Sequence, residues 1–500
     1  MPFTRASAVR LVRFLVRAFF RRIEVSGASL VPKSGGGILV AWHPNGLVDP
    51  ALILATFPRQ VVFGARHGLF EWPVIGRLMR ALGTVPIYRA SDSSQDDEQT
   101  RRQANRQSLD GLARAVCEGR FAALFPEGVS HDEPFPQELK TGAARLYFSA
   151  MQMCAGDGPP PVIIPVGLHY DDKTMFRSDA LVEFHAPLEI PARLREPIAE
   201  DDDEALRARS AELTAMLEPI LKEVTHATES WELNRLMNRV RSLVRAERAR
   251  RAGVSLSTPN MVERTLGMAR VWTGYYARMR TEPDQVTQLL DRIAAYDQAL
   301  REVELEDDDL DKPPAIESKW LPWLLAVQAA FVFLVFPPVL LLGSLINVVP
   351  YLLIDRVAKM GAKQYKDTAT IKLFAGLVLF PLAWLTAALL VGFGQIQLHD
   401  SYAGIPRAPW AAGIVTFLTG AFGGALALVY LELVRRTWTS IKIRATRRWG
   451  SEIIDQLAHE RAALYDEIED VRRGLELPGE VLDDGRIGVR EFALDPDDVP

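Results

Sequence analysis

The segment Ile38-Leu-Val-Ala-Trp-His43-Pro-Asn-Gly-Leu-Val-Asp49-Pro50 runs from an apolar stretch through a turn into a helical pattern. The apolar run followed by Pro-Asn-Gly predicts a buried strand that ends at a tight turn, so His43 stands at the exit of that strand. Asp49 directly before Pro50 has the form of a helix N-cap followed by proline at the first helical position. A capping aspartate at the mouth of a sheet can also face an imidazole a few residues earlier. The segment therefore predicts a strand–turn–helix unit with a candidate His–Asp pair.

Short apolar stretches alternate with helical stretches on both sides of this segment. Such alternation predicts an α/β domain over residues 36–200, with a mixed sheet covered by helices. The expected strands are 38–42, 61–65, 84–88, 121–125, 162–168 and 181–184.

Three other predicted strands carry their own motifs. These are Gly83-Thr-Val-Pro-Ile-Tyr-Arg89, Leu124-Phe-Pro-Glu127-Gly128-Val-Ser130-His131-Asp132 and Val162-Ile-Ile-Pro-Val-Gly-Leu-His-Tyr170. With these blocks in this order, residues 38–170 resemble the glycerolipid acyltransferase superfamily, which acylates glycerol phosphates and lysophospholipids. The form His-Pro-Asn-x-x-Val-Asp-Pro is similar to the fungal glycerol-3-phosphate/dihydroxyacetone-phosphate acyltransferases and their bacterial relatives. Those proteins also carry membrane segments after the catalytic domain.

One spacing departs from most of that superfamily. Most members have four residues between the motif histidine and aspartate, whereas five separate His43 from Asp49, as in the fungal branch. The extra residue can be absorbed in the Pro-Asn-Gly loop before the helix starts. We therefore expect the two side chains to meet.

The resemblance implies that His43 is a general base and Asp49 its partner. A carboxylate fixes the tautomer of an imidazole, which then takes a proton from an attacking hydroxyl. The resemblance also places Arg89, Glu127 and Gly128 at the site for the phosphorylated acceptor. Arginine gives a phosphate two parallel charge-assisted hydrogen bonds, and a glycine turn lets backbone N–H groups approach the ligand closely.

Several residues near the Pro-Glu-Gly turn have alternative interpretations. Glu127 would hydrogen-bond the glycerol hydroxyl or orient Arg89, and a structural Arg89–Glu127 ion pair is the alternative. Lys140 would add charge to the phosphate site, or be a solvated lysine at a helix start. Ser130 is a candidate hydrogen-bond donor to phosphate. The adjacent residues Ser130-His131-Asp132 cannot aim their side chains into one relay, so we predict no hydrolase triad there.

The composition of the chain limits which partners and cofactors are expected. The chain has 58 Lys+Arg against 63 Asp+Glu and a formal net charge of −5, so we expect no nucleic-acid partner. The two cysteines, Cys117 and Cys154, are too few for a disulfide framework or a four-ligand zinc site, and they fit an ordinary reducing compartment. We expect no metal and no cofactor, because the expected donors, acyl-CoA or acyl-ACP, are thioesters that are already activated. The expected acceptors are glycerol-3-phosphate or a lysophospholipid.

Three long stretches near the C-terminus contain no Asp, Glu, Lys or Arg. Each exceeds the roughly 20 residues needed to cross a bilayer, so residues 319–434 predict an integral membrane region. Pro337-Pro338 divides the first stretch, which favours a helical hairpin with both ends on one side over a single span. The predicted segments are 321–354 as a hairpin or span, 373–394 as a span and 409–431 as a span.

Basic residues around these stretches predict their sidedness. They gather in 356–372 and in 435–448, which assigns both segments to the cytoplasm. The catalytic domain shares that cytoplasmic face only if residues 321–354 turn back.

The remaining regions are helical or linker-like. Residues 1–35 place Arg10, Arg13, Arg17 and Arg21 on one helical stripe beside apolar residues. This predicts a basic amphipathic helix at a membrane interface, with a core-docked helix as the alternative. Residues 201–318 predict a charged helical region and linker, and 435–500 a cytoplasmic helix with an acidic tail.

Three other functions compete with glycerol-phosphate acylation. The same residues would acylate a lysophospholipid, chiefly lysophosphatidate. A catalytically silent membrane scaffold or lipid binder would use the helices of 205–305 as its interaction surface. A phospholipid hydrolase would need a nucleophile that the sequence does not reveal.

Overall fold

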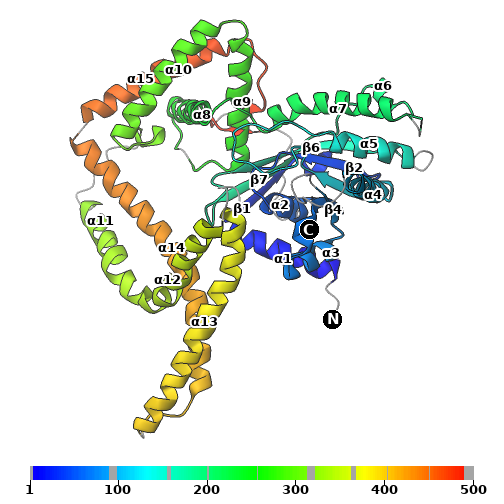
Figure 1. The fold of residues 1–500 in the computed structure, drawn as a ribbon. Helices are drawn as coiled ribbons and strands as arrows, with labels where there is room; N and C mark the ends of the chain where they lie inside the picture. Colours follow the sequence, from blue (N-terminus) through cyan, green and yellow to red (C-terminus); the bar gives the residue numbers. More distant parts are fainter. Residues whose placement is uncertain are drawn as a thin grey trace.

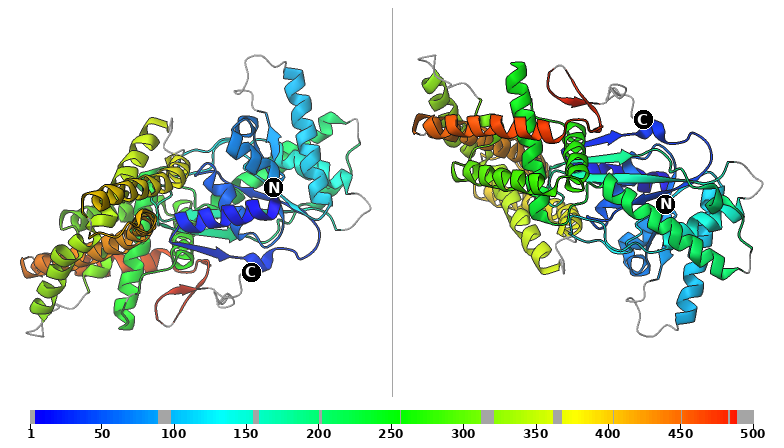
Figure 2. Two further views of the ribbon diagram at one scale, coloured as in Figure 1. Left: turned by 90° about the horizontal axis from the view of Figure 1, so that it is seen from below. Right: turned by 90° about the horizontal axis from the view of Figure 1, so that it is seen from above.

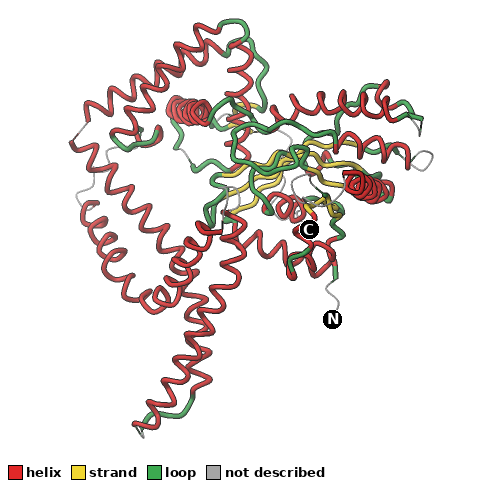
Figure 3. The backbone as a smooth tube through the Cα atoms, in the orientation of Figure 1, coloured by secondary structure: helices red, strands yellow, loops and turns green. Residues whose placement is uncertain are grey.

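The structure is a computed structural model of the 500-residue chain (Figure 1). It places an α/β domain beside a helical unit and a group of long helices, and all but two very short strands lie in the α/β domain (Figure 3). The described residues are 4–88, 98–154, 159–199, 202–255, 257–311, 321–361, 368–402, 404–449, 451–482 and 484–488.

Seven strands of the described chain form the sheet of the α/β domain. Their order is β1-β7-β6-β2-β5-β3-β4, and every neighbouring pair is parallel except β6 with β7. This confirms the predicted mixed α/β domain; β1 lies outside the predicted strands. The strands are β1 Arg22–Ser26, β2 Gly37–Ala41, β3 Val61–Arg66, β4 Val85–Ile87, β5 Phe121–Leu124, β6 Val162–Tyr170 and β7 Asp179–Phe184.

Helices cover both faces of this sheet. Along β2, Leu39 packs with the helices on one face, whereas Ile38 and Val40 pack with those on the other, as the two-residue period of a strand requires. The first face carries α1 Arg5–Phe19, α2 Val48–Thr56 and α3 Pro73–Leu82, and the second carries α4 Glu98–Cys117, α5 Gly142–Met153 and α7 Asp203–Val224. A short helix, α6 Ala192–Arg195, precedes α7.

The apolar face of α1 is buried in the domain. Val12, Val16 and Phe19 belong to the core beneath the sheet, and only Leu11 and Phe14 remain as exposed large apolar residues of the helix. The apolar face that we expected to meet lipid therefore meets the sheet instead, because burial against β-strands removes that surface from solvent. The core-docked alternative describes this helix.

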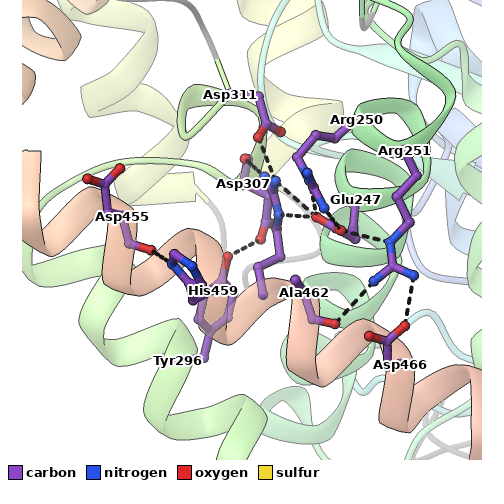
Figure 4. Close-up of polar contacts among 11 residues, drawn as sticks. Glu247, Arg250, Arg251, Tyr296, Asp307, Asp311, Asp455, His459, Ala462 and Asp466 are labelled. Carbon is purple, nitrogen blue, oxygen red and sulfur yellow. Dashed lines mark hydrogen bonds and ion pairs between the residues drawn. The ribbon is translucent and has the colours of Figure 1, made fainter.

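A second unit combines chain segments that are far apart in sequence. Helices before and after the long C-terminal helices pack around one apolar cluster that includes Leu243, Ile293 and Leu464. Arg461 is fully buried here, and it donates to Glu247, to the Asp307 carbonyl and to Asp311. Figure 4 labels these three acceptor residues. The members of this helical unit are α8 Trp231–Ala252, α9 Met261–Met279, α10 Pro283–Glu302, α15 Ser451–Val471 and the hairpin β8 Glu480–Val481 with β9 Ile487–Gly488.

The long helices between these halves pack on one another. Asn347 on one of them donates to the carbonyls of Gly343 and Gly420 and accepts from Trp384 Nε1, so it ties three helices together. In both views of Figure 2 these helices lie to one side of the α/β domain. They are α11 Leu321–Ala330, a π-helical stretch Phe331–Val335, α12 Phe336–Gly361, α13 Thr368–Ser401 and α14 Pro409–Trp449.

Within the described residues, one helical segment, Ala375–Ser401, is long and apolar enough to cross a membrane. By length and composition it supports membrane association. Helix runs through 321–361, including Pro337-Pro338, without an intervening loop, and the predicted number of crossings stays a prediction.

The two cysteines pair with each other. Cys117 at the end of α4 and Cys154 after α5 form a disulfide, with Cα atoms 5.2 Å apart. The cysteine count was interpreted as fitting a reducing compartment, and this bond could not be foreseen because the two residues meet only when α4 packs on α5.

Candidate active site

Three adjacent strands bring the sequence motifs together. β6, β2 and β5 are neighbours and run parallel, so their carboxyl ends meet at one edge of the sheet. His43 follows β2, Glu127 follows β5, and Tyr170 ends β6.

His43 and Asp49 are in contact. His43 Nδ1 lies 2.7 Å from Asp49 Oδ2, and the histidine ring stacks on Phe125 with ring centroids 4.1 Å apart. Because a carboxylate accepts the hydrogen bond, Nδ1 carries the proton and Nε2 is the basic nitrogen. No described residue hydrogen-bonds that Nε2, which leaves it available to a substrate hydroxyl.

Asp49 accepts hydrogen bonds from three neighbouring groups. Its carboxylate is fully buried and accepts from Asn45 N–H at 2.7 Å and from the Tyr170 hydroxyl, besides His43. Burial and then the neighbouring Asp49 raise the pKa of Tyr170 well above its ordinary value, so this hydroxyl stays a donor. The N-cap interpretation of Asp49 is wrong: α2 begins at Val48, and Asp49 lies inside its first turn.

Glu127 braces the loop that holds His43. Its carboxylate is fully buried and accepts from His43 N–H at 2.9 Å, from Gln137 N–H at 2.9 Å and from His131 Nε2 at 2.7 Å. His131 Nδ1 accepts from Glu133 N–H, so its proton is on Nε2 and is donated to Glu127. Both oxygens are therefore occupied by protein donors. Arg89, the predicted partner of Glu127, lies outside the described residues.

The other residues that were predicted to bind the acceptor substrate lie at and around the glycine of this turn. Gly128 has φ of +71°, and a Cβ built there would lie 3.0 Å from Lys140 Nζ, so the lysine side chain passes directly over the glycine. Lys140 N–H also donates to the Pro126 carbonyl at 2.8 Å. Ser130 is half-buried on the same loop. The left-handed backbone therefore favours glycine at this position, and an added Cβ would also displace the lysine side chain.

The sequence did not reveal the residues that hydrogen-bond the backbone of the loop after His43. Lys173 Nζ donates to the Pro44 carbonyl at 3.2 Å and pairs with Asp132, and Asn45 Nδ2 donates to the Lys173 carbonyl at 2.9 Å. Tyr170 was visible only as the end of a strand motif. Because β6 is a parallel neighbour of β2, a tyrosine at the end of β6 lies close to the end of β2, and this position in the motif is the signal that could have identified Tyr170.

The helical unit touches the same loops. Trp231 Nε1, at the start of α8, donates to the Asp132 carbonyl at 3.0 Å, and Thr228 N–H, in the connection before α8, donates to the Pro134 carbonyl at 3.1 Å. On the far edge of the sheet, Glu24 accepts from the first two N–H groups of α9. The unit is therefore fixed against the α/β domain at two places.

The remaining histidines of the domain lie in other surroundings. His169 Nε2 and His185 Nε2 are 3.5 and 3.6 Å from Glu183 Oε2. Burial alone would raise the pKa of Glu183, but the two neighbouring histidines lower it overall. In the part of the chain that the structure describes, no group of three or more His, Cys, Asp or Glu residues could hold a metal ion.

The comparisons with known proteins agree with this geometry. The sequence profile of the family named Acyltransferase matches residues 22–169, which contain His43, Asp49 and Glu127. Residues 22–169 belong to the acyltransferase family. The chain is 27% identical to glycerol-3-phosphate O-acyltransferase 1 of Saccharomyces cerevisiae over 476 residues, covering 78% of this chain and 59% of the yeast protein.

Other acyltransferases match shorter parts. A 1-acyl-sn-glycerol-3-phosphate acyltransferase of Neisseria meningitidis is 25% identical over 172 residues, covering 34% of this chain and 57% of that protein. The crystal structure of a 1-acyl-sn-glycerophosphate acyltransferase from Thermotoga maritima is 19% identical with a TM-score of 0.29, covering 44% of this chain and 82% of that one. The chain spans 54% of an uncharacterized acyltransferase of Schizosaccharomyces pombe, and so little more than half the length of such curated relatives.

Proposed function

We propose that this acyltransferase moves a fatty acyl group from acyl-CoA or acyl-ACP to the hydroxyl of glycerol-3-phosphate or dihydroxyacetone phosphate. The observation that carries the proposal is the contact between His43 Nδ1 and the buried Asp49 carboxylate, which leaves Nε2 as a base. The proposal also draws on the similarity to the yeast glycerol-3-phosphate acyltransferase along most of this chain. A silent scaffold would not need a buried, triply bonded aspartate behind its histidine.

The chemistry is a single acyl transfer. His43 Nε2 takes the proton of the acceptor hydroxyl as its oxygen attacks the thioester carbonyl. The carbon–sulfur bond then breaks, and the thiolate leaves with the proton that the imidazolium returns. Asp49 stabilises that imidazolium without taking the proton itself.

The acceptor phosphate would bind beside the Pro-Glu-Gly turn. Lys140 places a cation over the turn at Gly128, and Ser130 adds a hydroxyl to the same loop. Arg89, which follows β4 in the chain, completes the set in this proposal. Glu127 acts in it as the residue that orients the His43 backbone rather than as a ligand of the acceptor.

Acylation of lysophosphatidate is the second candidate, because the Neisseria relative is named for that reaction. An assay of the purified full chain with labelled acyl-CoA separates the two. We expect product from glycerol-3-phosphate or dihydroxyacetone phosphate at a kcat/KM above that for lysophosphatidate. Turnover of lysophosphatidate alone would reject the proposed acceptor and keep the acyltransferase, and turnover of none would reject both.

The way in which the helical unit is assembled bears on which face of the membrane carries the catalytic domain. Asp311 before the long helices and Arg461 after them are hydrogen-bonded at 2.6 Å (Figure 4). A segment whose two ends are fixed in one unit must leave and return on the same face, so it crosses a membrane an even number of times. We propose that α13 and α14 cross and that 321–361 turns back, with the catalytic domain on the cytoplasmic face.

Cysteine labelling in sealed membranes tests this arrangement. A cysteine replacing Asp470 on α15 and one placed at position 363 should be labelled from the same face as the catalytic domain. Gly404→Cys, in the connection between α13 and α14, should be labelled from the opposite face. Labelling of position 363 together with Gly404→Cys would establish a single crossing before residue 363 and overturn the proposal.

A further inference from the structure

The helical unit contains an apolar cavity of about 110 Å³, remote in sequence from every active-site motif. Its walls come chiefly from α8, α9 and α10 and include Val240, Val271 and Ile293. Gly267 and Gly274 lie two turns apart on one face of α9 and also line it. A Cβ added to Gly274 would meet no atom within 4 Å, so the space above this glycine is open. Engineered apolar cavities of about 150 Å³ take up small apolar ligands.

A polar hollow of about 360 Å³ adjoins this cavity. The two share Arg270, Arg472 and Leu477 among their lining residues, so they form neighbouring chambers. The hollow is lined mainly by the loop after α15, with Arg473 and Glu469 as its other charged residues. An apolar chamber beside a cationic one suits a molecule that is apolar at one end and anionic at the other.

Arginine is in excess over carboxylate around the apolar cavity. The arginines lining it are Arg241, Arg245, Arg248, Arg270 and Arg472. Within the described residues, Glu263 pairs with Arg245 at 2.7 Å and Glu469 pairs with Arg472, whereas Arg241 and Arg270 have no carboxylate within ion-pair distance.

Arg248 differs from the other arginines of this group because one of its buried nitrogens has no hydrogen-bond partner among the described residues. It is 8% exposed, its Nη1 is buried without a hydrogen-bond partner among the described residues, and its Nη2 lies 3.8 Å from Glu469. A buried guanidinium with an unmet donor is costly unless an anion satisfies it.

Two further arginines show the same imbalance. Burial and then nearby arginines lower the pKa of Arg241 and of Arg270 to about 10. Both remain charged at neutral pH, so repulsion persists around the cavity. A bound anion would relieve it.

We propose that this pair of chambers binds an amphiphile that carries a phosphate group and an acyl chain. The phosphate would bind Arg248, Arg270 and Arg472, and the first part of the chain would enter the apolar cavity over Gly274. Lysophosphatidate and acyl-CoA both have this chemistry. The inference does not depend on which acceptor the active site uses.

Photolabelling of the purified full chain in non-ionic detergent tests the proposal. The probe is a lysophosphatidate with a diazirine on its acyl chain, and labelled peptides are identified by mass spectrometry. We expect label on the peptides of 261–302. Unlabelled lysophosphatidate or palmitoyl-CoA should reduce this label, and the stronger competitor identifies the ligand. Uncharged monoacylglycerol should not reduce it. Label within 36–200 reports the active site separately.

Two variants and two controls make the test specific. Gly274→Leu fills the cavity and favours the helix, and we expect it to reduce label on 261–302 at least about tenfold, as a loss of affinity of that size would. Arg248→Gln should have a similar effect, about tenfold, through the lost charge-assisted hydrogen bond. Gly111→Leu on α4, where an added Cβ also meets nothing, and Arg280→Gln, an exposed arginine after α9, should leave the label unchanged.

Three results would overturn the proposal. One is the absence of label on 261–302 while 36–200 is labelled. Another is undiminished label in Gly274→Leu. The third is equal competition by monoacylglycerol, which would reduce the site to an apolar crevice with no preference for phosphate.

Discussion

The α/β domain and the helical unit both bury a carboxylate in a network of donors, but they assemble these networks differently. In the α/β domain, Glu127 and Asp49 are bonded by residues of the short motifs in which they lie and by the ends of neighbouring strands. In the helical unit, Glu247 pairs with Arg250 and Arg251 of its own helix. It is also bonded by Arg461, which stands more than two hundred residues later in the chain. In the proposed mechanism the first network positions the base His43, whereas the second network joins two distant segments of the chain.

The largest effect that this comparison predicts is the loss of the base. His43→Ala should reduce turnover at least about 100-fold, the usual scale for removing a general base. The Glu127 carboxylate bonds the backbone N–H of His43, so the loop and the fold should persist. Steady-state kinetics of acyl transfer, with circular dichroism as the control for folding, measure both. Near-normal turnover in a folded variant would refute the mechanism.

Arg461→Met should affect the helical unit and spare the chemistry. Breaking a buried ion pair by removing one partner costs about 3 kcal/mol or more, so amide exchange in α15 should accelerate strongly. Arg292→Met is the matched control, since Arg292 makes exposed pairs across α10 and α15 that are worth less than about 1 kcal/mol. A fall in turnover as large as that of His43→Ala would show that the two networks are not separate.

The same contrast explains what the sequence could predict. The strands over 38–184 and the His43–Asp49 contact follow from local patterns, because each motif closes its own turn and parallel strands align their ends. The helical unit could not be foreseen, since no local pattern pairs Arg461 with Glu247. The burial of the α1 apolar face, the Cys117–Cys154 bond and the role of Tyr170 were missed for the same reason.

Tyr170→Phe should have the smallest effect of the changes considered. It removes one hydrogen bond to Asp49, worth about 1 kcal/mol, and we expect kcat to fall up to about tenfold with little change in KM. Tyr147→Phe serves as the control, because this buried tyrosine has no hydrogen-bond partner among the described residues. Kinetics that respond equally to both changes would assign Tyr170 to packing alone.

Asp49→Asn tests the central claim most directly. The asparagine oxygen can still accept from His43 Nδ1 and from Asn45 N–H, so the shape of the site is kept. The neutral amide no longer stabilises the imidazolium that forms when His43 takes a proton, so the base is lost in function. We predict a folded protein whose melting temperature is close to that of the unaltered chain and whose turnover falls at least about 100-fold. A folded Asp49→Asn protein with undiminished acyl transfer would contradict the assignment of His43 and Asp49 as the catalytic pair.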